Sequence, residues 1–150
     1  MNDNISSTYQ LSFRVSHPLL RSDKISAELG LDPIHAWNVG ERARNKKNEE
    51  FGSVKNDTYC SYAVDYGLDV SGIADEISRF LGDMEGHKDF LQQIVETGGK
   101  LCLYLAWFIS NRMSGEIFAS ALLEKIANLQ IDFVIEIYPD MKAVEHDRMS

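Results

Sequence analysis

Apolar and polar residues alternate along several segments of the chain, which is typical of strands that bury one face. The clearest run begins at Tyr9, where apolar residues at odd positions alternate with polar ones at even positions until His17 and Pro18 end it. Two other segments are rich in aromatic and β-branched residues. The predicted strands are residues 9–16, 58–66, 100–110 and 131–138, with short extended pieces at 36–39 and 116–118.

Segments with helical spacing separate these strands. Residues 23–29 are predicted to form a short helix, with Ser22 or Asp23 as its N-cap and Gly30 as the left-handed residue that ends it. Another helix is predicted over residues 122–129, after a turn at 111–115. Residues 41–55 are polar and are predicted to form a mobile loop.

The longest predicted helix, residues 73–96, separates apolar from charged surface. At about 100° per residue, its apolar side chains fall on the side of Ile73 and its carboxylates on the opposite side. Gly82 and Gly86 each cost about 1 kcal/mol relative to alanine in a helix. Phe90 falls on the acidic side. Either the helix breaks near Gly86 and buries Phe90, or Phe90 is an exposed aromatic of the kind that anchors interfaces.

The order of these elements predicts an α+β fold. We expect a ferredoxin-like open-faced sandwich, with one mixed or antiparallel sheet and its helices on one face. A β-α-β-β-α-β string occurs twice, over residues 9–109 and 58–138. The length suits a single domain, so residues 1–150 are predicted to form one, with an ordered core at about 8–139 and a frayed tail at 140–150.

The sheet face without helices is expected to be partly exposed and rich in tyrosine. It either packs against the basic loop or the tail, or serves as a platform for a ligand or partner. Its expected members are Cys60, Tyr62, Tyr66, Tyr104, Phe108 and Tyr138, with Trp37 at the entry to an edge strand.

Negative charge is concentrated in residues 65–96, which we call the acidic segment. It contains eight acidic residues against Arg79 and Lys88, so it carries −6 of the formal net charge of −8. Such a surface repels nucleic acid and anionic lipid and attracts basic protein surfaces within a Debye length of about 8 Å. We therefore expect a basic protein partner, with no nucleic acid and no membrane.

Candidate chemistry is sparse. The chain has no glycine-rich phosphate motif, and its four histidines lie in different elements, with no other metal ligand three or four residues after any of them, which predicts no metal site. No cofactor is expected, and the lack of a catalytic pattern predicts that the protein is not an enzyme. The N-terminus lacks a signal peptide and no apolar run could span a bilayer, so we expect a cytoplasmic protein.

A local motif carries a family resemblance. Gly30-Leu31-Asp32-Pro33 is followed by Trp37-Asn38-Val39-Gly40, and a terminal strand ends in Tyr138. With these features, residues 9–139 resemble the bacterial domain-of-unknown-function family numbered four-two-seven-nine. The resemblance brings no established activity, but it implies a likeness to small proteins encoded beside bacterial toxins.

Two functions follow as expectations. The first is an immunity protein that neutralises a basic, nuclease-type toxin domain through the acidic helix face. The second is a ligand-binding or regulatory module that uses the exposed sheet face. The partner-binding residues of the first are Asp65, Asp69, Asp75, Glu76, Asp83, Glu85, Asp89 and Phe90, and the ligand face of the second comprises Trp37, Tyr62, Tyr66, Tyr104 and Tyr138.

Overall fold

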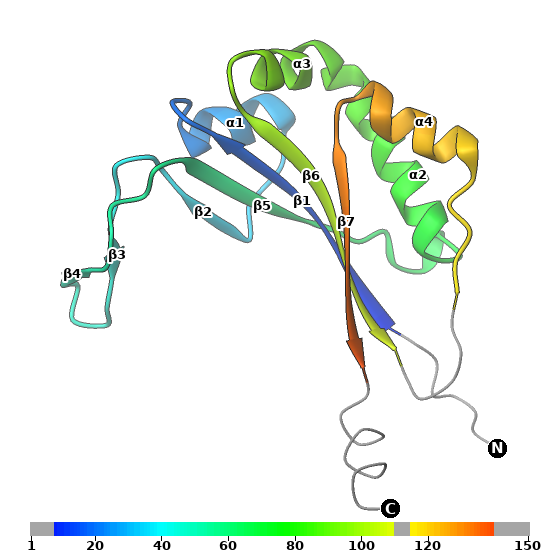
Figure 1. Cartoon of the computed structure of the whole chain (residues 1–150), viewed down its shortest axis with the longest axis horizontal. Coiled ribbons are helices and arrows are strands. Elements are labelled where there is room, and N and C mark those ends of the chain that lie inside the picture. Colours follow the sequence, from blue (N-terminus) through cyan, green and yellow to red (C-terminus); the bar gives the residue numbers. More distant parts are fainter. Residues whose placement is uncertain (1–7, 110–114, 140–150) are drawn as a thin grey trace, which may run out of the picture.

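The computed structural model describes residues 8–109 and 115–139. In these residues a five-stranded sheet of order β2-β5-β1-β6-β7 is packed against four α-helices (Figure 1). The strands of the sheet are β1 (Thr8–His17), β2 (His35–Trp37), β5 (Thr58–Val64), β6 (Lys100–Ile109) and β7 (Asp132–Pro139). The helices are α1 (Ser22–Leu29), α2 (Ile73–Met84), α3 (Lys88–Glu96) and α4 (Ser120–Asn128), with 3-10 turns η1 (Gly67–Asp69) and η2 (Glu85–His87).

The sheet topology confirms the ferredoxin-like prediction for the first β-α-β-β-α-β unit. The central strand β1 is antiparallel to both β5 and β6, and β2 is antiparallel to β5. Helix α4 then leads to β7, which pairs parallel with β6. The expected second copy of the unit is wrong, because residues 115–119 form no strand. The predicted turn at 111–115, except for Gly115, and the tail at 140–150 lie outside the described residues.

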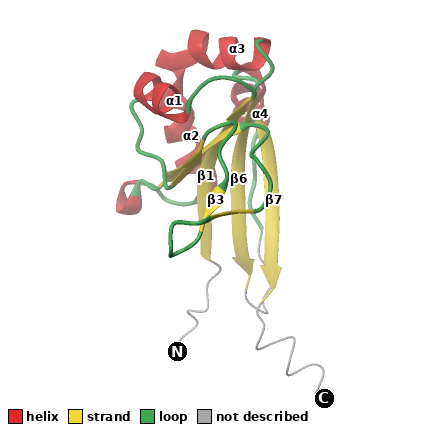
Figure 2. Cartoon of the chain, turned by 90° about the vertical axis from the view of Figure 1, so that its left-hand side faces the viewer, coloured by secondary structure: helices red, strands yellow, loops and turns green. Residues whose placement is uncertain are grey.

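One face of the sheet forms the core. Its register places Phe13 of β1 opposite Tyr62 of β5 and Leu103 of β6, and all three are buried. The four helices lie together on this side of the sheet, as predicted (Figures 1 and 2). Phe80 of α2 contacts Phe13, with 5.0 Å between ring centroids. We call this the covered face and the opposite side the open face, which no described helix covers.

The long helix predicted over 73–96 breaks at η2. The break separates α2 from α3 and includes Gly86. Phe90 is half-buried and packs against the hydrophobic core. Of the two alternatives, the structure therefore bears out the break, and Phe90 as an exposed anchor is wrong.

Helix α1 begins one residue earlier than its expected caps imply. Its N-cap is Arg21, so neither Ser22 nor Asp23 has that role. The Ser22 backbone N–H donates to the Asn38 Oδ1 atom at 2.7 Å, so a side chain from the segment after β2 satisfies an N-terminal donor of the helix. Gly30 ends the helix in the left-handed conformation, with φ of 67°, as predicted.

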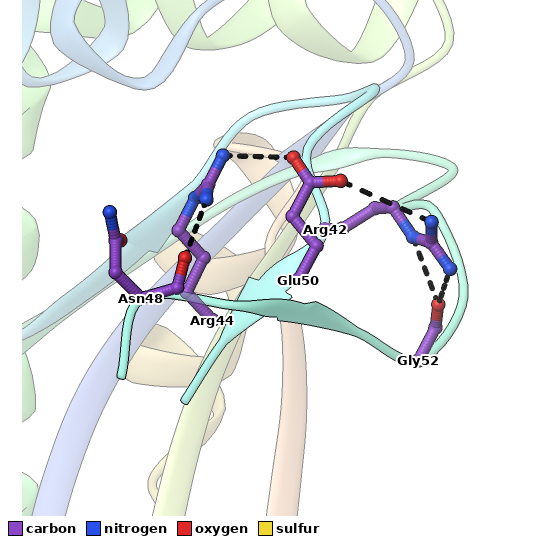
Figure 3. A network of polar contacts seen from close by, with 5 residues as sticks. All are labelled: Arg42, Arg44, Asn48, Glu50 and Gly52. Atoms are coloured by element: carbon purple, nitrogen blue, oxygen red, sulfur yellow. Dashed lines mark hydrogen bonds and ion pairs between the residues drawn. The ribbon is translucent and has the colours of Figure 1, made fainter. Parts of the chain in front are cut away.

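Residues 41–55 form a hairpin where a mobile loop was predicted. Strands β3 (Ala43–Arg44) and β4 (Glu50–Phe51) pair with each other and project away from the main sheet (Figure 1). Figure 3 shows the polar contacts that brace them: Arg44 pairs with Glu50 at 2.8 Å, and the Arg42 guanidinium donates to the Gly52 carbonyl. The prediction missed this because the hairpin depends on charge pairing more than on apolar periodicity.

Candidate functional site

The acidic segment lies on the outer side of α2 and α3. Ile73, Ile77 and Leu91 point to the core and are buried, while most carboxylates face away from it. Of the eight acidic residues in this segment, the exposed ones are Asp65, Asp69, Asp75, Asp83, Glu85, Asp89 and Glu96.

Glu76 is the exception among the predicted binding residues. It is only 4% exposed, and its Oε2 atom accepts the Tyr66 backbone N–H at 2.9 Å. Burial raises the pKa of Tyr9, and the charge of Glu76 and a hydrogen bond to it raise that pKa further. Glu76 therefore anchors the segment after β5 to α2. Its prediction as a partner-binding residue is wrong, because a buried carboxylate cannot contact a partner.

Three of the exposed carboxylates also hold local structure together. Asp75 accepts the Ser71 backbone N–H at 3.0 Å, and Asp65 accepts that of Gly67 at 2.9 Å. Asp83 accepts a hydrogen bond from the Tyr66 hydroxyl. Burial raises the pKa of Tyr66, and this hydrogen bond to Asp83 raises it further.

The remaining exposed carboxylates are available to a partner, and among them only Glu96 accepts a side-chain hydrogen bond in the described residues, from the Gln92 amide at 3.0 Å. We call the set Asp69, Glu85, Asp89 and Glu96 the acidic surface. Within the described parts of the chain, ion pairs within 4.0 Å join Lys24 to Glu28 and Arg42 and Arg44 to Glu50, so none involves the acidic segment. No cation of the described residues is consequently in contact with it to offset its negative potential.

The tyrosines predicted for the exposed sheet face divide between three places. Tyr62 lies in the core on the covered face, where its hydroxyl and the Ser26 Oγ atom are 2.9 Å apart, and Cys60 is buried on the same face. Tyr66 lies beside α2. The predictions for these three residues are therefore wrong. Tyr62 and Cys60 belong to β5, which presents aromatic and polar residues in both phases of its alternation, and Tyr66 lies beyond the end of that strand.

Trp37 is on the open face, in β2 at the edge of the sheet, away from Tyr104 and Tyr138. It stacks on Tyr59, with 4.5 Å between ring centroids, and the Lys55 Nζ atom lies 4.3 Å from the Trp37 ring centroid. The Lys55 ammonium and the Trp37 and Tyr59 rings are therefore already engaged with each other, near the base of the β3–β4 hairpin.

Tyr104 and Tyr138 belong to a polar network on the open face, as expected for that face. The Arg14 guanidinium carbon lies 3.6 Å from the Tyr104 ring centroid. Hydroxyl donation from Tyr104 and Tyr138 lowers the pKa of Glu136, and the Phe108 ring stacks on that of Tyr138. The network thus connects three neighbouring strands, β1, β6 and β7.

A cavity of about 580 Å³ opens on this face beside the network. Its lining comes from β1, β5, β6, the residues that enter β2, the segment after β5 and Glu76 of α2. The polar side chains that line it are Tyr9, Gln10, Ser12, Arg14, His35, Ser61, Asp65, Glu76 and Tyr104. Arg14, Ser12 and Glu136 were missed from the sequence, since polar residues at alternate positions of a strand are also what an ordinary wet face has.

The described parts of the chain hold neither a metal-binding cluster nor a membrane-spanning helix. Histidine, cysteine and carboxylate side chains form no group of three that could hold a metal ion. None of the helices there combines the length and apolarity that crossing a membrane would require.

The fold and these two surfaces define a small α+β protein built on an extended ferredoxin-like sheet. A family model described as "Domain of unknown function (DUF4279)" matches residues 7–140, so the chain belongs to this family and the resemblance inferred from its motifs is confirmed. Searches of curated proteins and of solved structures found no match.

Proposed function

We propose that this protein is a non-enzymatic binding protein that neutralises a basic, nuclease-type toxin domain, as an immunity protein does. The observation that carries the proposal is the acidic surface: exposed carboxylates presented by η1, η2 and α3, with no cation in contact among the described residues. A nuclease needs a basic cleft to hold nucleic acid, and an anionic protein surface can occupy it.

The placement of these carboxylates suits fast capture of such a partner. Glu85, Asp89 and Glu96 follow one another at near-helical spacing along η2 and α3, whose apolar side is fixed to the core by Leu91 and Ile94. A rigid array of one sign raises the association rate, up to about 10⁸–10⁹ M⁻¹s⁻¹ at low salt. Rapid association is useful to a protein that must block a toxin before it acts.

A triple charge reversal, E85K/D89K/E96K, tests the proposal. The probe is the protein encoded by the adjacent gene, and binding rates are measured at several salt concentrations. We expect at least a tenfold loss of affinity at low salt, mostly as slower association, which shrinks as salt rises because the attraction is screened. Denaturant unfolding should show little change in stability, since all three side chains are exposed.

The matched control reverses three exposed carboxylates elsewhere, D32K/E49K/E124K. It changes the net charge by the same amount, so any loss specific to the first variant is due to position. Equal affinities for the two triple variants would contradict the acidic surface as the docking site.

A second candidate function is a small-ligand module on the open face. The open-face cavity favours it, because about 580 Å³ lies within the range of small-molecule sites. This function uses other residues, so variants of the acidic surface would leave it intact.

A further inference from the structure

Arg14 occupies an unusual position for a cation. It lies in the middle of β1, the central strand, and is half-buried on the open face among β5 and β6. No carboxylate of the described residues lies within 4.0 Å of its guanidinium nitrogens. Hydroxyl donation from two tyrosines, and also the charge of Arg14, lowers the pKa of Glu136. Because no described carboxylate is in contact with the guanidinium, however, its hydrogen-bonding edge is available to a ligand.

The guanidinium is nevertheless held in a defined orientation. Its Nε atom donates to the Ser12 Oγ atom at 3.2 Å, and its plane lies over the Tyr104 ring, with 3.6 Å between the guanidinium carbon and the ring centroid. The Tyr104 hydroxyl in turn donates to Glu136, which also accepts from Tyr138. These contacts fix the ring and the stacked cation before any ligand arrives.

The surroundings of Arg14 indicate what it could bind. With Nε engaged by Ser12, the two terminal nitrogens are the fork that binds an oxyanion with two parallel hydrogen bonds. Ile34, Ala63 and Ala106 give the same cavity apolar surface for the body of a ligand. Asp65 and Glu76 in the lining, with the chain's net charge of −8, disfavour a dianion more than a monoanion.

We propose that the open-face cavity binds a small planar carboxylate, with the Arg14 fork on the carboxylate and the ligand body over the apolar floor. This inference rests on the second candidate function and names its ligand class. It does not depend on the acidic surface, which lies on the outer side of the helices that cover the other face of the sheet.

The test uses 2-naphthoate as the probe. Its binding to the full chain is measured by isotope-edited NMR titration. We expect saturable shifts centred on the amides of Ser12, Arg14 and Tyr104. Arg14→Gln should weaken binding at least tenfold. Arg14→Lys should have an affinity close to that of Arg14→Gln, since lysine keeps the charge but lacks the planar fork. The matched control is Arg21→Gln, an exposed arginine at the start of α1, which should bind as wild type does.

Two analogues of the probe separate the alternatives. Uncharged 2-naphthamide should bind at least tenfold more weakly than 2-naphthoate, and equal binding would overturn the role of the charge. Tighter binding of 2-naphthyl phosphate would overturn the carboxylate assignment in favour of a phosphate. No saturable shifts with 2-naphthoate, or unchanged affinity in Arg14→Gln, would overturn the site itself while the proposed docking of a basic toxin stands.

Discussion

The two faces of the same sheet are built by different rules. On β1, Phe13 points to the covered face and is fully buried against Tyr62 and Phe80, whereas the next residue, Arg14, points to the open face and is stacked on Tyr104. The covered face is filled by apolar volume, while side chains on the open face are oriented by hydrogen bonds and stacking. Binding chemistry on the open face can therefore change at little cost to the fold.

The largest expected effect comes from exchanging these two neighbours for alanine. Phe13→Ala should lower the free energy of unfolding by about 3–5 kcal/mol, because it leaves a cavity under α2. Arg14→Ala should cost about 1 kcal/mol or less, through loss of the cation–π contact. Urea unfolding of both variants measures the difference. Similar losses would mean that the open face contributes to stability as the covered face does.

The sequence predicted the covered face well where alternation was clean. The odd residues of β1 and β6 face the core as expected, since a period of two leaves no freedom once one face is buried. The prediction was wrong at Tyr62. Its phenol ring is apolar enough for the core, and its hydroxyl forms a hydrogen bond with Ser26 there. The prediction also failed at Glu76, because a helical wheel cannot show that the chain after β5 folds back over α2.

The open-face site was harder to predict for another reason. Its central pair, Arg14 and Tyr104, is brought together by pairing of β1 with β6, 90 positions apart in the sequence. Tyr104 was predicted as a tyrosine of this face, but Arg14 does not stand out in its own strand. Residue periodicity gives the face of a side chain, but the register between distant strands decides which side chains meet.

A smaller effect tests how tightly the helices are packed on the covered side. Gly99 lies between α3 and β6, where an added Cβ would come within 2.5 Å of the Ile94 side chain and 2.7 Å of the Ser16 carbonyl. Gly99→Ala should therefore cost about 1–3 kcal/mol. Gly82, in α2, has nothing within 4 Å of such a Cβ, so Gly82→Ala should stabilise by up to about 1 kcal/mol. Thermal unfolding measures the melting temperatures of both variants. Equal changes in melting temperature would contradict tight packing around Gly99.

The smallest expected effect is a pH dependence at the end of the covered face. His17 is 3% exposed, its Nδ1 atom accepts the backbone N–H groups of Leu19 and Leu20, and its Nε2 atom lies 2.7 Å from the Thr97 Oγ1 atom. Two donors at Nδ1 require the neutral ring with its proton on Nε2. Burial lowers the pKa of His17, and the charge of Asp57 opposes this only in part.

Because the native pKa lies below the unfolded value of about 6.5, the unfolded chain binds the proton more readily. The stabilising contribution of neutral His17 is therefore fully present above about pH 6.5 and is lost as pH falls from there to the native pKa. The slope for one proton is at most about 1.4 kcal/mol per pH unit. His17→Asn keeps a short acceptor but cannot titrate, so the stability difference between wild type and this variant should narrow between pH 7.5 and pH 5 in urea unfolding. A constant difference, together with an NMR titration of the His17 ring that gives an ordinary pKa, would show that protonation does not disturb this end of the covered face.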